Sequence, residues 1–595
     1  MHLYSAFVGI ASATNAPLAT PMLGWSTWNQ LRGNFNASVL QSIARAMNSS
    51  GLRAFGYTYF NVDDLWASSE RDAASGEMTA DPAKFPDGMA SFGEWLHSNG
   101  FQLGLYTARY NRTCSGKMPG SLGFEAVDAA TFSRWGVDFL KNDDCRVVYA
   151  NAVRDYGAMQ RALARVERPI LHAVKAPDLP PSAARAVAQM RRVGKDLKNS
   201  WSNVMRLVDT GVAPAFERLA GPGFFNDFDM LFVGVSEASP SGDAQLTETE
   251  QRSHFSLWSA LKSPIVLGND PRSMSAATRA ILLNADVLAV NQDRLAAPVR
   301  RLPRNPAAAA LHVPRDGDKL YLERCDARLP SQRWALARRN ANATLLSLRS
   351  NATGANSSSA LCAGVYKCLD RWPWLITLGA CAGSARSGPS SKCTPNARSQ
   401  WVRVAADSDP HRVGFRLQWS NVEAGKSGWP SSGASHGGSC LSTEGSNVEV
   451  DVCDWPADAT QQEWFEHVDA ASGATQIVSA HSGLCLASIG GADRYVGPLA
   501  AGAATAVLLN RASAPLTITL SMNEVRSVVP DFAAPAVEVR PSGEARGAAR
   551  RAPLRVEATD LWTKATTAVD AADGLLSYVV PSHAAVHVRM QAAVR

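Results

Sequence analysis

Short apolar segments alternate with segments of helical period over residues 20 to 297. Apolar residues recur every three to four positions in Val39–Met47, Met89–His97 and Val127–Trp135, as they do in amphipathic helices. Strands that alternate with helices predict a parallel sheet. Eight such units in about 280 residues predict a (β/α)8 TIM barrel, and an open doubly wound sheet is the alternative that fits the same pattern. The eight apolar segments are Met22–Trp28, Tyr57–Asp64, Gln102–Ala108, Val137–Asp143, Pro169–Lys175, Val187–Arg192, Phe224–Met230 and Pro264–Asp270.

The sequence pattern and the composition change around residue 313, where helical periodicity fades and Gly, Ser, Asn and Trp become more frequent. Three stretches resemble one another, because each ends in a Gln-x-Trp or Gln-Trp element, at Trp334, Trp401 and Trp464. Cys-Leu pairs begin the later units, at Cys368, Cys440 and Cys485. A repeat of several tens of residues indicates a repeated structural unit.

Beyond about residue 490 the pattern is that of short strands separated by turn residues. The candidates are Ala506–Leu509, Leu516–Leu520, Val537–Val539 and Val586–Val588, with a further one that holds Asp560-Leu561-Trp562. This pattern predicts a small antiparallel β-sandwich.

The composition argues against a disordered chain, a nucleic-acid-binding protein and a membrane-spanning protein. Hydrophobic residues make up 46% and charged residues 19% of the 595 residues, which is ordinary globular usage rather than that of a disordered chain. The formal net charge of +6 is dilute over this length and no long run of Lys and Arg occurs, so nucleic acid is not an expected partner. Charges or prolines interrupt the apolar stretches before the roughly 18 residues that a membrane span needs.

The ten cysteines are unevenly placed: only Cys114 and Cys145 precede residue 320, and the other eight lie between Cys325 and Cys485. Six N-x-S/T sequons accompany them, at Asn36, Asn48, Asn111, Asn342, Asn351 and Asn356. Together they predict the secretory pathway, with a protein that is secreted or delivered to a vacuole or lysosome. Residues 1–16 are apolar and end in small residues, which predicts a signal peptide; because they lack Lys and Arg, a disordered start is the alternative.

Carboxylates lie at or just after the ends of four of the predicted strands. They are Asp63-Asp64, Asp143-Asp144, Asp196, and Asp227 with Asp229. The C-terminal strand ends of a barrel build its active site, and a buried charge is costly unless it is paired. Carboxylates that converge there favour acid/base or nucleophilic chemistry, and a ring of structural ion pairs around the rim is the alternative.

Motifs in order across residues 20–297 carry a family resemblance. They are Thr20-Pro-Met-Leu-Gly-Trp-Ser-Thr-Trp28, Val62-Asp-Asp64, Leu103-Gly-Leu-Tyr106, Pro119-Gly-Ser-Leu-Gly123, Trp135-Gly-Val-Asp-Phe-Leu-Lys141, Gly221-Pro-Gly223, Asn226-Asp-x-Asp-Met-Leu231 and Ala260-Leu-Lys-Ser-Pro264. In these motifs the chain resembles the glycoside hydrolase family 27 of α-galactosidases and α-N-acetylgalactosaminidases. Gly497-Pro-Leu499 and Asp560-Leu-Trp562 are similar to the C-terminal sandwich of that family.

The resemblance implies roles for the matching residues. Asp143 matches the nucleophile and Asp196 the general acid/base of a retaining enzyme that removes terminal α-D-galactosyl residues by double displacement. Lys141 and Arg192 are expected to lower the pKa of Asp143. The reaction calls for no cofactor and no metal, and the alternatives are α-N-acetylgalactosaminidase or β-L-arabinopyranosidase specificity, or a non-catalytic carbohydrate-binding protein. The expected substrate-binding residues are Trp28, Asp63, Asp64, Tyr106, Cys114, Lys141, Lys175, Arg192 and Met230.

One stretch departs from the family pattern. The fifth strand of family members usually ends in Cys-Glu-Trp, where the Glu helps to recognise the 2-substituent of the sugar. Here the stretch is Ala173-Val174-Lys175, so a Lys reverses the charge and the Cys is absent. Altered specificity at the 2-position or reduced activity is the resulting hypothesis, and compensation by a neighbouring loop is the alternative.

The Gln-x-Trp region resembles a ricin-type β-trefoil lectin domain, which either binds glycans or acts as a structural spacer. The resemblance implies the disulfides Cys114–Cys145 in the barrel, and Cys368–Cys381 and Cys440–Cys453 in the repeats. For a permuted trefoil with adjacent ends it adds Cys325–Cys485, which leaves Cys362–Cys393. The expected organisation is a signal peptide at 1–16, a barrel at 17–297, a trefoil-like insertion at 313–490, and a sandwich made of 298–312 and 491–595.

Overall fold

The protein is seen here in a computed structural model. The structure describes residues 18–145, 152–175, 179, 181–212, 216, 219–236, 245–302, 492–512, 515–532 and 555–593, together with strand segments between 319 and 489. The predicted signal peptide and the Val537–Val539 strand candidate lie outside the described residues.

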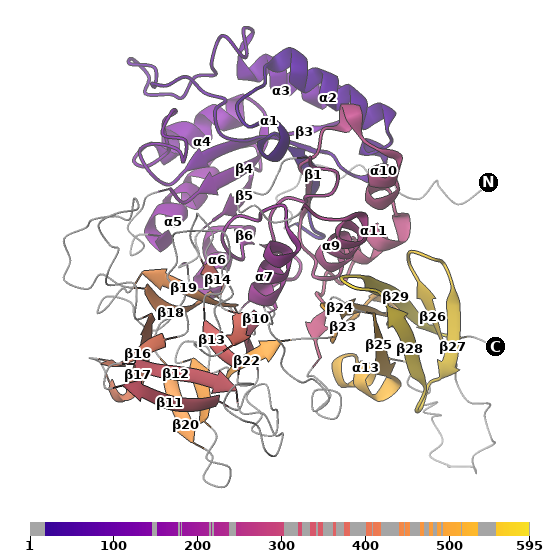
Figure 1. Ribbon diagram of the computed structural model, residues 1–595. Helices are drawn as coiled ribbons and strands as arrows, with labels where there is room; N and C mark the ends of the chain where they lie inside the picture. Colours follow the sequence, from indigo (N-terminus) through magenta and orange to yellow (C-terminus); the bar gives the residue numbers. More distant parts are fainter. Residues whose placement is uncertain are drawn as a thin grey trace, which may run out of the picture.

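Eight parallel strands form the TIM barrel that holds the first half of the chain (Figure 1). From β1 to β7 each strand pairs with the next, and β1 also pairs with β8. A parallel bridge between Leu231 and Leu267 joins the segment after β7 to β8. The barrel prediction is therefore confirmed over the open doubly wound sheet. The strands are β1 (Leu23–Ser26), β2 (Tyr59–Val62), β3 (Gln102–Ala108), β4 (Val137–Asp143), β5 (Leu171–Val174), β6 (Met190–Arg192), β7 (Phe225–Asp227) and β8 (Ile265–Leu267).

Helices cover the outside of the barrel, and side-chain caps fix where several of them begin. Asn36 accepts a hydrogen bond from the Val39 N–H, and a reciprocal capping box links Thr247 and Glu250. The three predicted helical segments are confirmed, although the last helix ends one residue before Trp135. The helices are α1 (Trp28–Leu31), α2 (Ala37–Ser49), α3 (Gly88–Ser98), α4 (Glu125–Arg134), α5 (Ala152–Leu163), α6 (Pro181–Val187), α7 (Trp201–Gly211), α9 (Glu248–Ala260), α10 (Ala276–Leu282) and α11 (Ala285–Asn291).

Apolar side chains fill the barrel below the strand ends that carry the carboxylates. Met22, Phe139, Met190 and Phe225 are buried together there. The packing is close at Gly104, where a Cβ would lie 1.9 Å from the Asn61 Oδ1 atom and 2.9 Å from the Phe139 ring, so a larger residue would force these side chains to shift. The filled interior leaves the C-terminal strand ends as the place for a binding pocket.

The C-terminal region consists of antiparallel strands in two sheets over a shared apolar core. The larger sheet has the order β27-β26-β29-β24-β23-β9, and β25 pairs with β28 in the smaller one. In the larger sheet, strand β9 precedes residue 313 and pairs with β23, which follows residue 490. The elements are β9 (Arg300–Arg301), β23 (Ala492–Pro498), β24 (Ala504–Asn510), β25 (Leu516–Ser521), α13 (Met522–Val528), β26 (Arg555–Asp560), β27 (Thr566–Asp570), β28 (Leu575–Val580) and β29 (Ala585–Ala592).

Three of the strand candidates in this region are confirmed, in β24, β25 and β29. The expectation for Asp560-Leu561-Trp562 is wrong for its last two residues, because β26 ends at Asp560 and a turn follows. Trp562 instead packs on the barrel: its indole N–H donates to the Ser256 hydroxyl at 2.9 Å, and its ring meets that of Phe255 edge-on.

Between β9 and β23 the described strands pair only in antiparallel fashion. Three hairpins, β11–β12, β16–β17 and β20–β21, close into a ring, because β12 pairs with β16, β17 with β20, and β21 with β11. The first and last strands, β10 and β22, pair over five residues. The strands are β10 (Lys319–Glu323), β11 (Trp334–Asn340), β12 (Ala343–Leu348), β13 (Leu361–Gly364), β14 (Trp374–Leu375), β15 (Thr377–Ala380), β16 (Gln400–Ala406), β17 (Asp409–Leu417), β18 (Ser439–Glu444), β19 (Asn447–Val452), β20 (Trp464–Val468), β21 (Thr475–Ser479) and β22 (Cys485–Ile489).

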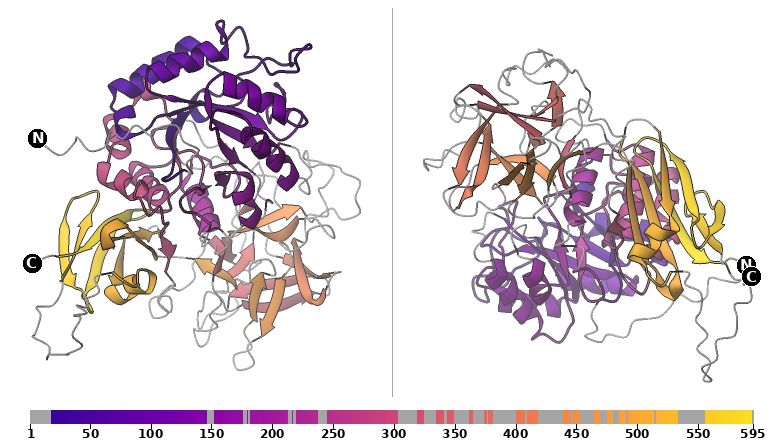
Figure 2. Two further views of the ribbon diagram at one scale, coloured as in Figure 1. Left: turned by 180° about the vertical axis from the view of Figure 1, so that it is seen from behind. Right: turned by 90° about the horizontal axis from the view of Figure 1, so that it is seen from below.

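The two regions that follow the barrel strands lie at different places against it. Figure 2 shows the strands of 319–489, in orange, on one side and the C-terminal sheets, in yellow, on the other. Among the helices that the structure describes, none combines the length and apolar character that a membrane crossing requires.

Candidate active site

A pocket lies at the C-terminal ends of the barrel strands, and the empty space in it, open solvent included, is about 690 Å³. The residues that line it come from the ends of strands and from the loops that follow them. All the predicted substrate-binding and catalytic residues except Asp64 are among them, namely Trp28, Asp63, Tyr106, Cys114, Lys141, Asp143, Lys175, Arg192, Asp196 and Met230.

Asp143 is the last residue of β4 and is almost fully buried. The Tyr106 hydroxyl donates to its Oδ2 at 2.9 Å, and the Asp144 N–H donates to its Oδ1 at 2.7 Å. Burial alone would raise the pKa of Asp143, but the ammonium groups of Lys175 and Lys141 outweigh it and hold the pKa below its ordinary value. Asp143 is therefore an ionised, oriented carboxylate, as a nucleophile must be.

Asp196 lies in the loop after β6, and its side chain is 48% exposed. Lys175 Nζ is 2.9 Å and Arg192 Nη2 is 3.2 Å from its Oδ1. These two cations overcome the effect of burial and lower the pKa of Asp196.

Lys175 lies between the two carboxylates: its Nζ is 3.4 Å from Asp143 Oδ1 and 2.9 Å from Asp196 Oδ1. The two Oδ1 atoms are therefore no more than 6.3 Å apart. Retaining glycosidases have their carboxyls roughly 5–5.5 Å apart and inverting ones roughly 6.5–9.5 Å apart. The geometry fits a retaining pair.

Arg192 has a different main partner from the expected one. Its buried guanidinium donates to Asp229 Oδ2 at 2.6 Å, and Asp229 also accepts from the Leu197 N–H at 2.8 Å. Of the two cations expected to lower the pKa of Asp143, Lys141 is confirmed and Arg192 interacts with Asp143 as well, but Lys175 has the largest effect of the cations. Asp229 is one of the strand-end carboxylates that the sequence places at this end of the barrel, but the family resemblance gives it no role, and its pairing with Arg192 is new here.

The two neighbouring carboxylates after β2 have separate surroundings. Asp63 faces the pocket and pairs with Lys141 at 2.7 Å; burial raises its pKa, and Lys141 opposes this rise. Asp64 does not line the pocket, and its oxygens accept from the Thr113 hydroxyl and the Ser115 N–H at 2.8 and 2.9 Å. Asp64 therefore holds the loop that carries Cys114, and its expected contact with the substrate stays a prediction.

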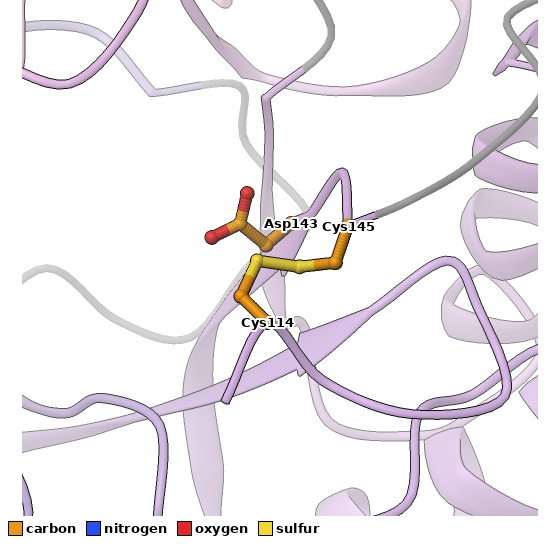
Figure 3. Close-up of side chains that lie close together, drawn as sticks. All are labelled: Cys114, Asp143 and Cys145. Atoms are coloured by element: carbon orange, nitrogen blue, oxygen red, sulfur yellow. A yellow bond between two sulfur atoms is a disulfide. The ribbon is translucent and has the colours of Figure 1, made fainter. Parts of the chain in front are cut away.

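A disulfide joins Cys114 to Cys145 beside Asp143 (Figure 3). The two sulfurs and the Asp143 carboxylate lie within 4.8 Å of one another. Sulfurs that are bonded in a disulfide are not thiolates, so this cluster does not present a thiolate metal site. The other predicted cysteine pairs, Cys325–Cys485, Cys362–Cys393, Cys368–Cys381 and Cys440–Cys453, lie outside the residues whose side chains are described.

Trp28 and Met230 complete the wall of the pocket, and both are half-buried. The Arg32 guanidinium lies 5.1 Å from the centre of the Trp28 ring, which fixes one side of the indole. The pocket thus combines apolar surface with a paired set of carboxylates and cations, which is the surrounding that a polar ring with many hydroxyls requires.

A family model described as Alpha galactosidase A matches residues 20–293. The α-galactosidase of Coffea arabica is 40% identical over 278 residues, which cover 46% of this chain and 71% of that protein. The α-galactosidase of Cyamopsis tetragonoloba is 38% identical over 285 residues, 48% of this chain and 67% of that one. The crystal structure of α-galactosidase I from Mortierella vinacea is similar in fold, with a TM-score of 0.55 at 20% identity over 98% of this chain and 100% of the other. By its sequence and its barrel, the chain belongs to the α-galactosidase family of glycoside hydrolases.

Proposed function

We propose that the protein is a retaining glycoside hydrolase that removes terminal α-D-galactosyl residues from oligosaccharides, polysaccharides or glycoconjugates. The observation that carries this is the pair of carboxylates at the pocket of a chain of this family: the Oδ1 atoms of Asp143 and Asp196 are no more than 6.3 Å apart. Asp143 is the nucleophile and Asp196 the general acid/base.

In the first step an oxygen of Asp143 attacks C1 of the galactose while the bond from C1 to the aglycone oxygen breaks, and that oxygen takes the proton of Asp196 as it leaves. Tyr106 and the Asp144 N–H orient the attacking carboxylate. In the second step Asp196 takes a proton from water, the water oxygen bonds to C1, and the Asp143 carboxylate is released. Because each displacement inverts the configuration at C1, the released galactose has the same anomeric configuration as the substrate.

The remaining pocket residues bind and orient the sugar. The Asp63 carboxylate and the Lys141 ammonium, which pair at 2.7 Å, are placed to accept from and donate to its hydroxyls. Trp28 offers an apolar face to the pyranose ring, and Met230 closes the wall beside it. Arg192, fixed by Asp229, contacts the substrate from the side of Asp196.

A panel of p-nitrophenyl glycosides tests this function. We expect release from the α-galactoside, and we expect Asp143→Asn to abolish it without loss of sugar binding. Failure to cleave any α-linked galactoside would reject the proposal and favour a non-catalytic carbohydrate-binding protein. Turnover that is unaffected by Asp143→Asn would reject the nucleophile.

Lys175 favours a second candidate, which is the same chemistry with a different preferred sugar. An ammonium stands where relatives present a Glu, so contacts with the 2-substituent differ. The same panel separates the α-galactoside from the α-N-acetylgalactosaminide and the β-L-arabinopyranoside. Faster turnover of either of these than of the α-galactoside would establish the shifted specificity.

Residues 313–490 are proposed to form a β-trefoil inserted into a sandwich made of 298–312 and 491–595. The ring of three hairpins supports this, because the first strand of each hairpin begins within one Gln-x-Trp or Gln-Trp element. The pairing of β10 with β22 brings the ends together, as an insertion requires. Peptide mapping should find Cys325 linked to Cys485, and a Cys325–Cys362 link would exclude the permuted trefoil. Glycan binding by this unit is tested with immobilised galactosides.

The protein is further proposed to pass through the secretory pathway to the cell exterior or to a vacuole or lysosome. The Cys114–Cys145 disulfide and the exposed sequons at Asn36, Asn48 and Asn111 support this. Expression of the full chain with its residues 1–16 should yield glycosylated protein, and an unglycosylated cytosolic product would contradict the proposal.

A further inference from the structure

The ammonium of Lys175 is fixed at the reaction centre rather than free to move as a surface lysine would be. Its side chain is 16% exposed. The backbone at this residue is held on both sides, because its N–H donates to the Asn142 carbonyl at 3.4 Å and its carbonyl accepts from the Tyr156 hydroxyl at 2.7 Å. The ammonium therefore has a defined place between the two reacting carboxylates.

The cations that face Asp196 differ in how strongly they stabilise its negative charge. Lys175 and Arg192 contact its Oδ1, while Lys141 and Asp143 act from a greater distance. Arg192 makes its shorter contact, 2.6 Å, to Asp229, so a second carboxylate already balances much of its charge. Lys175 makes its shorter contact, 2.9 Å, to Asp196 itself. Lys175 is thus the main partner of this carboxylate.

This pairing affects the two steps of the reaction in opposite ways. To act as an acid Asp196 must first be neutral, and protonation breaks its ion pairs with Lys175 and Arg192. To act as a base it must be ionised, which the same pairs favour. Once Asp143 is esterified, Asp196 is the one carboxylate of the two beside Lys175 that keeps its charge.

We propose that the Lys175–Asp196 ion pair makes the enzyme selective for galactosides whose leaving group departs as a stabilised anion, an inference that rests on the function proposed above. When the C1–O bond breaks, its electron pair stays on the aglycone oxygen. A phenolic oxygen keeps that pair as a phenolate, whereas an alkyl oxygen needs the proton of Asp196. Lys175 is therefore a positioning residue, because it affects the reaction through the protonation of Asp196.

The test compares leaving groups in the full-length wild-type enzyme, Lys175→Met and Lys175→Arg. We expect the kcat/KM of wild type for a series of aryl α-galactosides to fall steeply as the pKa of the phenol rises, and Lys175→Met to give a shallower slope. The kcat/KM for methyl α-galactoside relative to 4-nitrophenyl α-galactoside should rise about tenfold or more in Lys175→Met, since general acid catalysis contributes roughly 10²–10⁴-fold. Lys175→Arg should keep the wild-type slope because it keeps the charge.

Lys564→Met is the matched control, because it removes a half-exposed lysine of the C-terminal region far from the pocket, and its slope should equal that of wild type. Thermal unfolding of each variant shows that it is folded. A slope and a rate ratio in Lys175→Met that equal those of wild type would overturn the proposal, because they would mean that the ammonium leaves Asp196 before proton transfer.

A second measurement does not depend on turnover. Carboxyl NMR of ¹³C-aspartate-labelled protein, assigned with Asp196→Asn, should show that Asp196 titrates about one pH unit or more higher in Lys175→Met than in wild type or Lys175→Arg. Unchanged titration would overturn the ion pair, whatever the activity. A third outcome is that Asp196 titrates as expected but the wild-type protein turns over no galactoside. That result would overturn the proposed function, and the selectivity with it.

Discussion

The Tyr106 hydroxyl donates a 2.9 Å hydrogen bond to Asp143 Oδ2, and both residues are buried. This bond strengthens as negative charge returns to Asp143 when the covalent intermediate breaks down. We therefore expect Tyr106→Phe to lower kcat for an activated aryl galactoside about tenfold and kcat/KM less, with a burst of phenol release. Stopped-flow kinetics measure both. Tyr578→Phe in β28 is the control, and equal losses in kcat and kcat/KM would contradict this role.

Asp229 is expected to stabilise the protein as well as the site. Asp229→Ala leaves the buried Arg192 guanidinium without its main partner, which should lower the free energy of unfolding by about 3–5 kcal/mol. The exposed pair of Glu248 and Arg252 is the matched control, and Glu248→Ala should cost about 0.3–0.5 kcal/mol. Denaturant unfolding measures both, and similar losses would show that the Arg192 pair is not a buried ion pair.

The Cys114–Cys145 disulfide fixes the loop beside the nucleophile and spans 31 residues of sequence. The double variant Cys114→Ser/Cys145→Ser should lose about 3–4 kcal/mol of stability by the chain-entropy relation, together with most of the activity. The variant is preferable to a reductant because other cysteines remain in the chain. Unfolding and turnover that match wild type would contradict a role for the disulfide in holding the site.

Buried neutral histidines should make the fold sensitive to acid. Burial lowers the pKa of His172 to about 4 and those of His254 and His587 to about 3. The folded values lie below the unfolded value of about 6.5, so the unfolded chain binds protons first as the pH falls. Each histidine then removes about 1.4 kcal/mol of stability per pH unit between about pH 6.5 and its folded pKa.

Unfolding free energies at pH 7, 6 and 5 measure this dependence. His587→Gln, which lies in β29 far from the pocket, should reduce the slope by about 1.4 kcal/mol per pH unit. A slope identical to that of wild type would mean that His587 is protonated in the folded protein.

The barrel could be predicted because its strands are short apolar runs, whereas its helices have apolar residues at every third or fourth position. Gln102–Ala108 and Val137–Asp143 match β3 and β4 residue for residue. The later strands are shorter than the apolar segments that predict them, as in β7, which covers Phe225–Asp227 only. Apolar composition does not mark where a strand leaves the sheet, and the ends that turn into the pocket are the ones that carry its polar residues.

The members of the site could be found from motifs, but their pairing could not. Lys175 follows β5 and Asp196 follows β6, and their contact depends on how two loops fold over one another. The same is true of Arg192 and Asp229, which are 37 residues apart in sequence. The position of Asp64 behind the pocket wall likewise depends on Thr113 and Ser115, which sequence spacing does not connect to it.

The central claim is that Asp143 forms a covalent bond to galactose, and peptide mass mapping of a trapped intermediate tests it most directly. An activated fluorinated α-galactoside that forms the glycosyl-enzyme faster than it releases it should label one peptide, with the added mass on Asp143. A label on another residue, or galactoside hydrolysis that inverts the anomeric configuration with no labelled peptide, would contradict the account.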